Sequence, residues 1–549
     1  MMRRIIPFLL FMVFSSFGYA LCQEQEKDQQ KEQQKGEMPK LEIPEMTIVG
    51  KKAITLPFAR KGEVYGVDIY QAPPPDSSLL GDRPTIPLPL GSLPRWEERR
   101  VPWHAAVEGS LGSFATGRLR GNVDYGTSKW SLAGSGGYGR TNGHTGNATA
   151  NAINARVCGS SLVETDNEVL KTFRLSGQTS FSHDSYGMFG IRNTSVERNR
   201  SNIELLAGMA SLYRQGTNLS VDIGANIWRI TDSHNRVDSE ISAVSPRLTA
   251  SFTSDFAAIR LATNLSYTGS SLNSEVSTQS PSLLSISSEA RWSLSDRWLI
   301  HVGLRFGAGS DVVGNTKILL SPIAKLACQL DASSELSIWS KPDLNLSTYD
   351  EEIQINPYLA RRIDLRPQRT PVNFGSSLSY SRDVIAVEVS GEYTESSNTG
   401  LMIADSGAIH LEYVDAVQTS VQITGSVRPI EKSRIKFSAT LQPSHEKGRN
   451  EQLPMIPLVK LQSRGEYDLT LPMTVWSSLE YRSSRNVDRQ GLTQLGSFLS
   501  LGAGVSSSVF PRSVVSLEIL NLLNSAYEWW GGYVAPGREI VLEARLSLR

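Results

Sequence analysis

The chain has 549 residues, 55 basic and 55 acidic side chains, and a hydrophobic share of 40%. Because phosphate binding requires a surplus of basic side chains, zero net charge excludes nucleic acid as the expected partner. The three cysteines, Cys22, Cys158 and Cys328, are too few and too scattered for a disulfide framework or a zinc site.

Residues 1–20 have the pattern of a secretory signal peptide. Two arginines precede an apolar stretch from Ile5 to Phe17, and Gly18-Tyr19-Ala20 follows it. The apolar stretch is shorter than the roughly 20 residues that span a bilayer, and we expect cleavage after Ala20. The alternative is a lipoprotein signal ending at Cys22, but Leu21 stands where such signals have a small residue. The mature protein is therefore predicted to be exported.

Residues 21–102 are predicted to form an extended arm. The stretch 23–37, QEQEKDQQKEQQKGE, is of low complexity and cannot bury a core. Residues 38–102 contain 11 of the 26 prolines of the chain. Proline at this density excludes helices and central strands, so the arm resembles a linker.

From Trp103 to the end of the chain, apolar and polar residues alternate in segments of about ten residues. In the segment 433–441 the apolar face holds Ile435, Phe437, Ala439 and Leu441. The residues between them are polar or charged. The last segment, 540–548, repeats this pattern. A period of two over many segments indicates strands with one apolar and one polar face.

The length of these strands decides which face lies outside. Soluble sandwiches use strands of about five or six residues, whereas these segments are longer and carry aromatic residues such as Trp130 and Trp298 near their ends. A secreted β-solenoid would need a fixed short repeat, which is not present. Residues 103–549 therefore predict an all-β fold, a transmembrane antiparallel β-barrel of about 22 strands (20 to 24), preceded by the extended Pro-rich N-terminal arm. Longer connections are expected at 141–168 and 341–371, where the alternation lapses.

Two sequence motifs in this region resemble TonB-dependent receptors. Near the C-terminus the residues VVSLEILNLLN (514–524) precede Tyr527, Gly532-Tyr533 and Pro536-Gly537-Arg538, and a closing strand follows. This order is similar to the end of the receptors of that family. The second resemblance lies inside the barrel, in Leu320-Ser321-Pro322, Asn356-Pro357 and Leu365-Arg366-Pro367-Gln368. Together these motifs imply a receptor-type barrel over about four fifths of the chain.

A third segment, in the arm, resembles a TonB box. It comprises Thr47, Ile48, Val49 and Gly50, near the mature N-terminus. In the family, a globular plug domain separates the box from the barrel. Here only Lys51 to Pro102 lie in that interval, which is too short and too rich in proline for such a domain. The barrel also ends in Leu548-Arg549, where the family usually has an aromatic residue. The resemblance is therefore to the barrel part, without a recognisable plug.

The sequence predicts no enzyme activity, no cofactor and no metal. The segment from Gly134 to Gly139 fits G-x-G-x-x-G, but no apolar helix follows it, so we expect a strand. The seven histidines show no metal-ligand spacing. Charged residues on the polar faces are expected to form the hydrated wall of the lumen, with both signs mixed. They include Arg434, Lys436, Glu388, Glu392, Asp222 and Arg247.

Three functions remain open. The first is a receptor-like barrel for solute uptake across the outer membrane of a Gram-negative bacterium. The second is a passive, porin-like channel, and the third is a structural barrel that anchors a periplasmic or surface partner. The expected partners are outer-membrane lipid and either a TonB-type energising protein, which the resemblance implies, or a separate plug or lipoprotein. The solute is not encoded in any recognisable motif.

Overall fold

The computed structural model describes residues 103–548, apart from 128, 166–171, 191–195, 212–216, 235–236, 257–258, 275–277, 313, 361–363, 406–407, 470–471, 509 and 511. The predicted signal peptide (1–20), the arm (21–102) and the TonB-box-like Thr47–Gly50 lie outside the described residues. In the described part, no helix is both long and apolar enough to cross a membrane.

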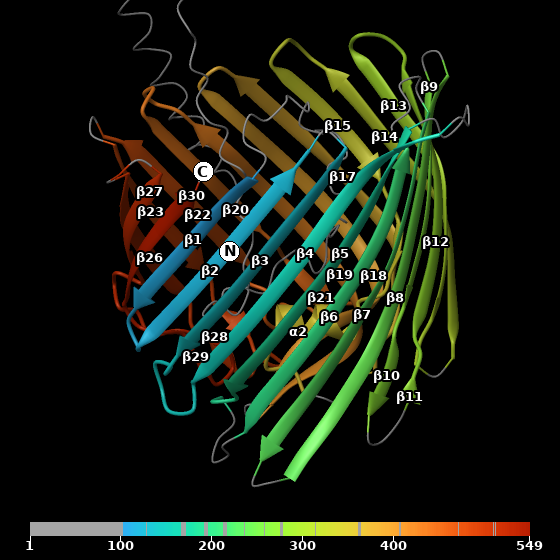
Figure 1. Cartoon of the computed structure of the whole chain (residues 1–549). Helices are drawn as coiled ribbons and strands as arrows, with labels where there is room; N and C mark the ends of the chain where they lie inside the picture. Colours follow the sequence, from blue (N-terminus) through green and yellow to red (C-terminus); the bar gives the residue numbers. More distant parts are fainter. Residues whose placement is uncertain are drawn as a thin grey trace, which may run out of the picture. The chain divides into compact units, whose positions relative to one another are not determined.

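The described chain is built almost entirely of antiparallel strands (Figure 1). The first half contains β1 (Trp103–Gly112), β2 (Thr116–Gly126), β3 (Trp130–Thr141), β4 (Ala150–Glu164), β5 (Thr172–Gly187), β6 (Glu197–Ser211), β7 (Thr217–His234), β8 (Val237–Phe256), β9 (Ile259–Gly269), β10 (Ser271–Ser274), β11 (Thr278–Gln279), β12 (Ser282–Ser293), β13 (Trp298–Ser310), β14 (Thr316–Gln329), β15 (Ser334–Ser340) and β16 (Asp343–Asn345). The second half contains the helix α2 (Tyr349–Ile355), then β17 (Gln368–Arg382), β18 (Ile385–Asp405), β19 (Ala408–Val427), β20 (Ser433–Leu441), β21 (Ser444–Glu446), β22 (Val459–Asp468), β23 (Met473–Arg482), β24 (Arg485–Asn486), β25 (Gln494–Leu495), β26 (Phe498–Ser507), β27 (Ser513–Leu520), β28 (Glu528–Trp530), β29 (Tyr533–Val534) and β30 (Glu539–Leu548).

The strands form one closed barrel. β1 pairs with β2 on one side and with the last strand, β30, on the other, so that Val107 lies opposite Leu546 and Leu111 opposite Leu542. Four of the barrel strands are each interrupted and appear as two consecutive segments. These are β9 with β10, β11 with β12, β15 with β16, and β20 with β21. Counting each pair once gives a barrel of 22 strands, as the sequence predicted.

Proline accounts for three of the four interruptions. Pro281 lies between β11 and β12, Pro342 between β15 and β16, and Pro443 between β20 and β21. Proline has no N–H group to donate to a neighbouring strand, so the ladder breaks there and resumes beyond it. The Gly134–Gly139 segment lies within β3, which confirms its interpretation as a strand.

The apolar faces predicted from the alternation point outward. Val302 and Leu304 of β13, and Leu542 and Leu546 of β30, are all exposed on the barrel surface. The intervening positions line the lumen and carry charges of both signs, as in the Arg247–Glu204 pair. Exposed tryptophans, including Trp103, Trp130, Trp292 and Trp298, gather at one end of the wall. This is the distribution that lipid on the outside and water on the inside require.

The two ends of the barrel differ in their connections. The end that holds Trp103 and Leu548, called the short-turn end, has brief turns where the structure describes them, such as 294–297 and 330–333. The opposite, long-loop end holds four long connections, 346–367, 447–458, 483–497 and 521–538, which we call the mouth loops. The expected connection at 341–371 is confirmed. The one at 141–168 is wrong, because residues 150–164 form β4, and the connection before this strand is 142–149.

Several strands are much longer than a bilayer requires. β7, β8, β18 and β19 have 18, 20, 21 and 20 residues, whereas about 9–11 residues span the hydrocarbon core. The extra length changes which face is apolar. In β7 the apolar residues point outward up to Ile227, and the next residue, Trp228, is buried inside. From that point the inner face of β7 carries the buried apolar residues Trp228 and Ile230, followed by the buried Asp232.

Candidate functional site

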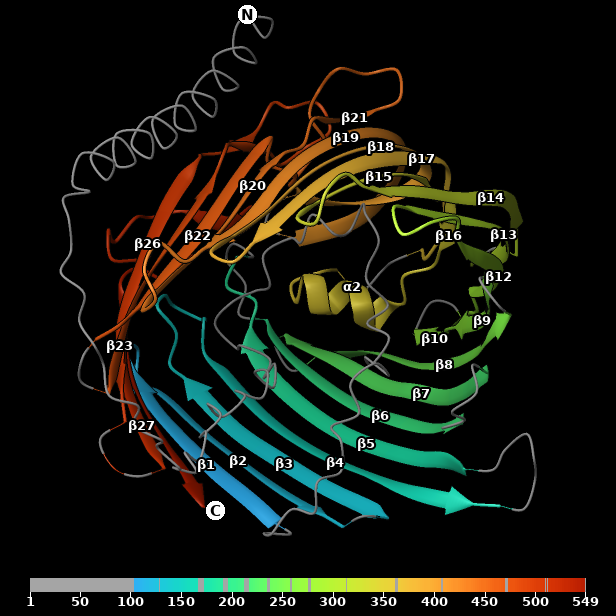
Figure 2. The ribbon, with the colours of Figure 1, turned by 90° about the horizontal axis from the view of Figure 1, so that it is seen from above.

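The candidate site is the long-loop end of the lumen, where loop segments lie inside the ring of strands (Figure 2). Helix α2 belongs to the mouth loop 346–367. Its start is stabilised by the Glu351 carboxylate, which accepts a hydrogen bond of 2.9 Å from the backbone N–H of Thr348. Asp350 accepts hydrogen bonds from the Asn226 amide and the Ser245 hydroxyl of the barrel wall. The helix is therefore attached to the wall by polar contacts at its first turn.

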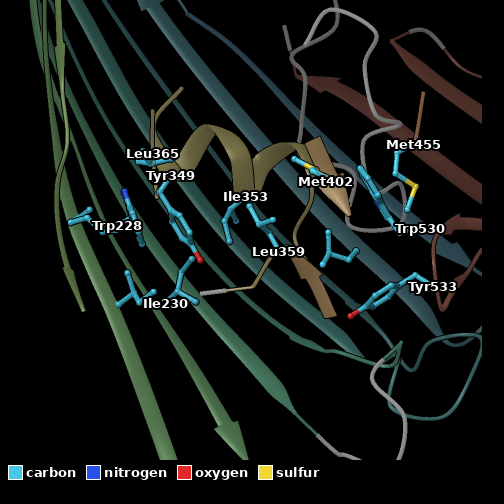
Figure 3. Packing of buried hydrophobic residues seen from close by; sticks show 14 of the residues in the cluster. Trp228, Ile230, Tyr349, Ile353, Leu359, Leu365, Met402, Met455, Trp530 and Tyr533 are labelled. Atoms are coloured by element: carbon cyan, nitrogen blue, oxygen red, sulfur yellow. The ribbon is translucent and has the colours of Figure 1, made fainter. Parts of the chain in front are cut away.

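An apolar core joins the mouth loops to the inner wall (Figure 3). The wall contributes Trp228, Ile230, Ile241, Ala243, Leu272, Met402 and Ile409, and the loops contribute Tyr349, Ile353, Leu359, Leu365, Met455, Val487, Leu495, Trp530 and Tyr533. Trp228 stacks on Tyr349 with ring centroids 4.7 Å apart. Burying each large apolar side chain contributes about 1.5–3 kcal/mol, so this cluster holds four loops in one folded unit.

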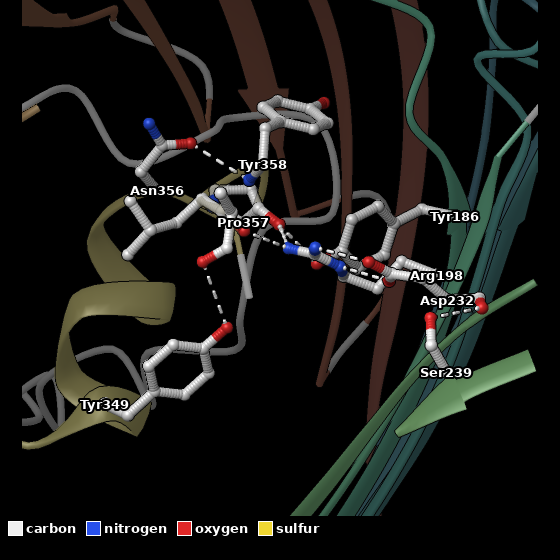
Figure 4. Close-up of polar contacts among 10 residues, drawn as sticks. Tyr186, Arg198, Asp232, Ser239, Tyr349, Asn356, Pro357 and Tyr358 are labelled. Atoms are coloured by element: carbon white, nitrogen blue, oxygen red, sulfur yellow. Dashed lines mark hydrogen bonds and ion pairs between the residues drawn. The ribbon is translucent and has the colours of Figure 1, made fainter. Parts of the chain in front are cut away.

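Arg198 of β6 connects the wall to the Asn356-Pro357 segment (Figure 4). Its guanidinium donates to both carboxylate oxygens of Asp232, at 2.7 and 2.8 Å. Nη1 donates to the backbone oxygens of Pro357, at 2.8 Å, and Leu359, at 2.7 Å. Arg198 is only 1% exposed. A buried guanidinium that satisfies a carboxylate and two carbonyl groups is a specific attachment, because removing any partner leaves a buried charge incompletely bonded.

A series of aromatic rings continues this contact across the mouth. Tyr358 stacks on Tyr533 with centroids 3.8 Å apart, and Phe189 meets both rings edge-on, at 5.7 and 5.2 Å. His144 packs against Phe189 at 5.5 Å, and its Nε2 lies 2.7 Å from the backbone oxygen of Val534. Burial raises the pKa values of Tyr358 and Tyr533, so both phenols are neutral near pH 7. Loops from distant parts of the chain are thus held together by ring contacts.

Solved structures that resemble this barrel include transporters and uptake receptors. The copper transporter OprC matches with a TM-score of 0.65 at 12% identity, over 81% of this chain and 82% of that one. The FrpB iron transporter from Neisseria meningitidis (F3-3 variant) matches at 0.67 and 11% identity, over 82% of each chain. The ferric yersiniabactin uptake receptor FyuA from Yersinia pestis matches at 0.63 and 13% identity, over 82% of this chain and 81% of that one. The barrel has the fold of a TonB-dependent receptor.

This fold was indicated by the two barrel motifs. No protein-family model and no curated protein matches the chain, and at 11–13% identity the structural likeness concerns the fold alone. Part of each motif of the TonB-dependent-receptor-like barrel lies in the mouth loops, whereas Leu320-Ser321-Pro322 lies in the wall strand β14. Asn356-Pro357 is the segment that Arg198 holds. Tyr533 of the C-terminal motif belongs to the apolar core.

The C-terminal motif also folds its own loop. The Asn521 side chain donates to the backbone oxygens of Ser525 and Pro536, at 2.9 and 3.0 Å. The Asn524 side-chain oxygen accepts from the backbone N–H of Arg538 at 2.8 Å. Both asparagines have positive φ, 46° and 53°, a conformation that asparagine tolerates better than most residues. The asparagines of the motif therefore fix the loop that carries Tyr533 into the mouth.

Sequence reasoning did not identify Arg198, Asp232 or the wall residues of the core as site residues. The sequence does contain a pattern that could have identified the wall residues of the core. Adjacent apolar residues, Ile227-Trp228 in β7 and Ala243-Val244 in β8, mark the point where apolar positions change from the outer to the inner face. Among the described residues, no group of three or more His, Cys, Asp or Glu side chains could hold a metal ion.

Proposed function

We propose that this chain is an outer-membrane transport protein that takes up a solute through its barrel, with the mouth loops as receptor and gate. The observation that carries the proposal is the apolar core between the mouth loops and the inner wall, together with the Arg198 attachment. Loops that merely bordered an open channel would not require a shared core. The similarity of the barrel to transporters and uptake receptors supports the same function.

The orientation in the membrane follows from the connections. Outer-membrane barrels have short periplasmic turns and longer extracellular loops. The mouth loops then face the exterior, where they meet the solute first. Trp103, the first described residue, lies at the short-turn end, so in this orientation the chain enters the barrel from the periplasmic side. There Thr47–Gly50 is available to a TonB-type energising protein, which would pair with it as an added strand.

The passive channel and the structural anchor are the alternatives. A passive channel requires a lumen that conducts without loop movement, which the packed core in the mouth disfavours. An anchor requires no solute path at all. A separate plug or lipoprotein partner is compatible with uptake, because the interval 51–102 is short for a plug domain.

The experiment measures binding of the periplasmic domain of a TonB-type protein to the purified full-length chain by surface plasmon resonance. Ile48→Pro removes a backbone donor from the TonB-box-like segment, and Ile54→Pro is the matched control in the same arm. Energised uptake predicts that Ile48→Pro abolishes binding and Ile54→Pro does not. Equal binding by both variants, or no binding by the native chain, contradicts energised uptake.

Conductance in planar bilayers separates the remaining functions. The native chain should conduct little, because the mouth is packed. A chain without residues 38–102 conducts more only if the arm obstructs the lumen. High conductance by the native chain indicates a passive channel. A structural anchor is indicated by three results together. Ile48→Pro leaves binding of the TonB-type domain unchanged, deletion of residues 38–102 leaves conductance unchanged, and the deletion removes a co-purifying partner.

A further inference from the structure

A second group of charged residues lies at the mouth, apart from the Arg198 attachment. Arg482 is the last residue of β23 and Arg485 the first of β24, at the base of the mouth loop 483–497. Arg482 lies opposite Phe498 of β26, and Tyr481 lies opposite Leu499, which is exposed on the outer surface. Alternation therefore directs Glu480 and Arg482 into the lumen. The two arginines are 0% and 1% exposed.

Aromatic rings from two elements surround the arginine pair. The Phe498 ring lies 5.8 Å from each guanidinium, and the Trp529 ring lies 5.3 Å from that of Arg482. Tyr527 stacks on Phe498 at 4.1 Å. Because Tyr527 and Trp529 belong to the mouth loop 521–538, this loop covers the pair. Cation–π contacts offset only part of the cost of burying a guanidinium.

One carboxylate is hydrogen-bonded to the pair, and the Glu528 carboxylate attracts the Arg485 guanidinium without bonding to it. Glu480 accepts from Arg482 Nε at 2.8 Å. Arg485 donates to the backbone oxygens of Glu528 and Trp529, at 2.7 and 3.1 Å, and these are neutral acceptors. The Glu528 carboxylate accepts instead from the backbone N–H of Gly532, at 2.8 Å. Within the described structure, two buried cations thus have one bonded carboxylate between them.

Donor atoms are also left over. Arg482 Nη1 and Arg485 Nε are buried and have no hydrogen-bond partner among the described residues. Buried donors without partners are rare in folded proteins, and each one requires a physical explanation. Burial and the charge of Arg482 lower the pKa of Arg485 to about 10, which is still well above physiological pH. The Arg485 guanidinium is therefore charged when it meets a solute.

We propose that Arg482 and Arg485 bind an oxyanion group of the solute, a carboxylate or a phosphate, when the mouth loop 521–538 moves aside. The inference rests on the proposed uptake function and names the chemical class of its solute. An oxyanion accepts from the unpartnered donors, and guanidinium groups suit carboxylate and phosphate geometry. The lumen-facing position selects a solute inside the mouth over a lipid headgroup outside the wall.

The test is isothermal titration calorimetry of the full-length protein in detergent, with inorganic phosphate and with benzoate as probes at constant ionic strength. Arg482→Gln and Arg485→Gln should each weaken binding by about tenfold or more, since each removes a charged donor. Arg489→Gln is the matched control. It lies in the same mouth loop but is already paired with Glu446 and Glu412, so its variant should bind as the native chain does.

Weaker binding by the arginine variants could also result from misfolding, so a further variant keeps both arginines. Trp529→Ala removes part of the cover and should bind phosphate more tightly than the native chain. Weaker binding by Trp529→Ala, equal binding by the Arg485 and Arg489 variants, or no binding of either probe overturns the inference. All variants should retain heat-modifiable migration in SDS gels. The proposed function is tested separately, because binding of the TonB-type domain does not involve this pair.

Discussion

Arg198 and Asp232 form a bidentate ion pair on the inner wall, and the same guanidinium holds the backbone of Pro357 and Leu359. This arrangement joins β6, β7 and the mouth loop 346–367 through one side chain. Arg198→Ala should free the loop and leave the Asp232 carboxylate buried without its main partner. Breaking a buried pair in this way costs about 3–5 kcal/mol. We expect faster hydrogen exchange in 346–360 and more frequent channel openings in planar bilayers.

The control for Arg198 is on the neighbouring strands. Arg229 pairs with Glu240, but the two side chains are 63% and 43% exposed. Solvent screening limits such a pair to about 0–1 kcal/mol. Arg229→Ala should therefore leave exchange in the loop unchanged. If both variants accelerate exchange equally, Arg198 is not a specific attachment.

The lipid-facing assignment can be tested at adjacent positions of β18. Val389 is 40% exposed and lies opposite Leu378 and Ile423, whereas Ser390 faces the lumen. Val389→Arg should cost about 2–4 kcal/mol if the position lies near the bilayer midplane, and Ser390→Arg should be tolerated. The measurement is reversible unfolding of the barrel in lipid vesicles. Similar destabilisation by both substitutions would contradict the assigned faces.

His144 predicts a pH dependence of the mouth. Burial lowers its pKa below the usual 6.5, so the folded state disfavours the protonated ring. Its contribution to stability is therefore complete above about pH 6.5 and is lost as the pH falls through the lowered pKa. Hydrogen exchange in 521–538, corrected for the intrinsic effect of pH, should accelerate between pH 7 and 5. His144→Asn should remove this dependence, and an unchanged profile would assign it to another group.

Gly190 tests the aromatic contacts without altering a charge. A Cβ atom at this position would lie 2.4 Å from the Tyr533 ring, so Gly190→Ala must displace Tyr533 from its stack on Tyr358. Such overpacking costs about 1–3 kcal/mol. The control is Gly146→Ala, since nothing lies within 4 Å of a Cβ there. Protease cleavage within the mouth loops should increase for Gly190→Ala only, and equal cleavage of the two variants would contradict the close contact.

Much of the fold was predictable because lipid imposes a simple pattern. Alternation around residues such as Phe437 and Leu542 identified strands and outer faces, since every outward position must be apolar within the bilayer. The strand number followed from counting the alternating segments between Trp103 and Arg549. The loop at 142–149 was overestimated because small residues of β4, such as Ala152 and Ala155, do not show a clear polar and apolar alternation.

The sequence by itself determined that this chain forms an outward-apolar barrel with a receptor-like C-terminal motif, because those features depend on neighbouring residues and on lipid. Only the tertiary structure decided which residues hold the mouth loops against the inner wall. Arg198 and Pro357 are 159 residues apart, and Trp228 and Tyr349 come from different elements. Such contacts depend on how the barrel curves and where each loop re-enters it. A buried arginine and an exposed one are identical in sequence, and only packing distinguishes them.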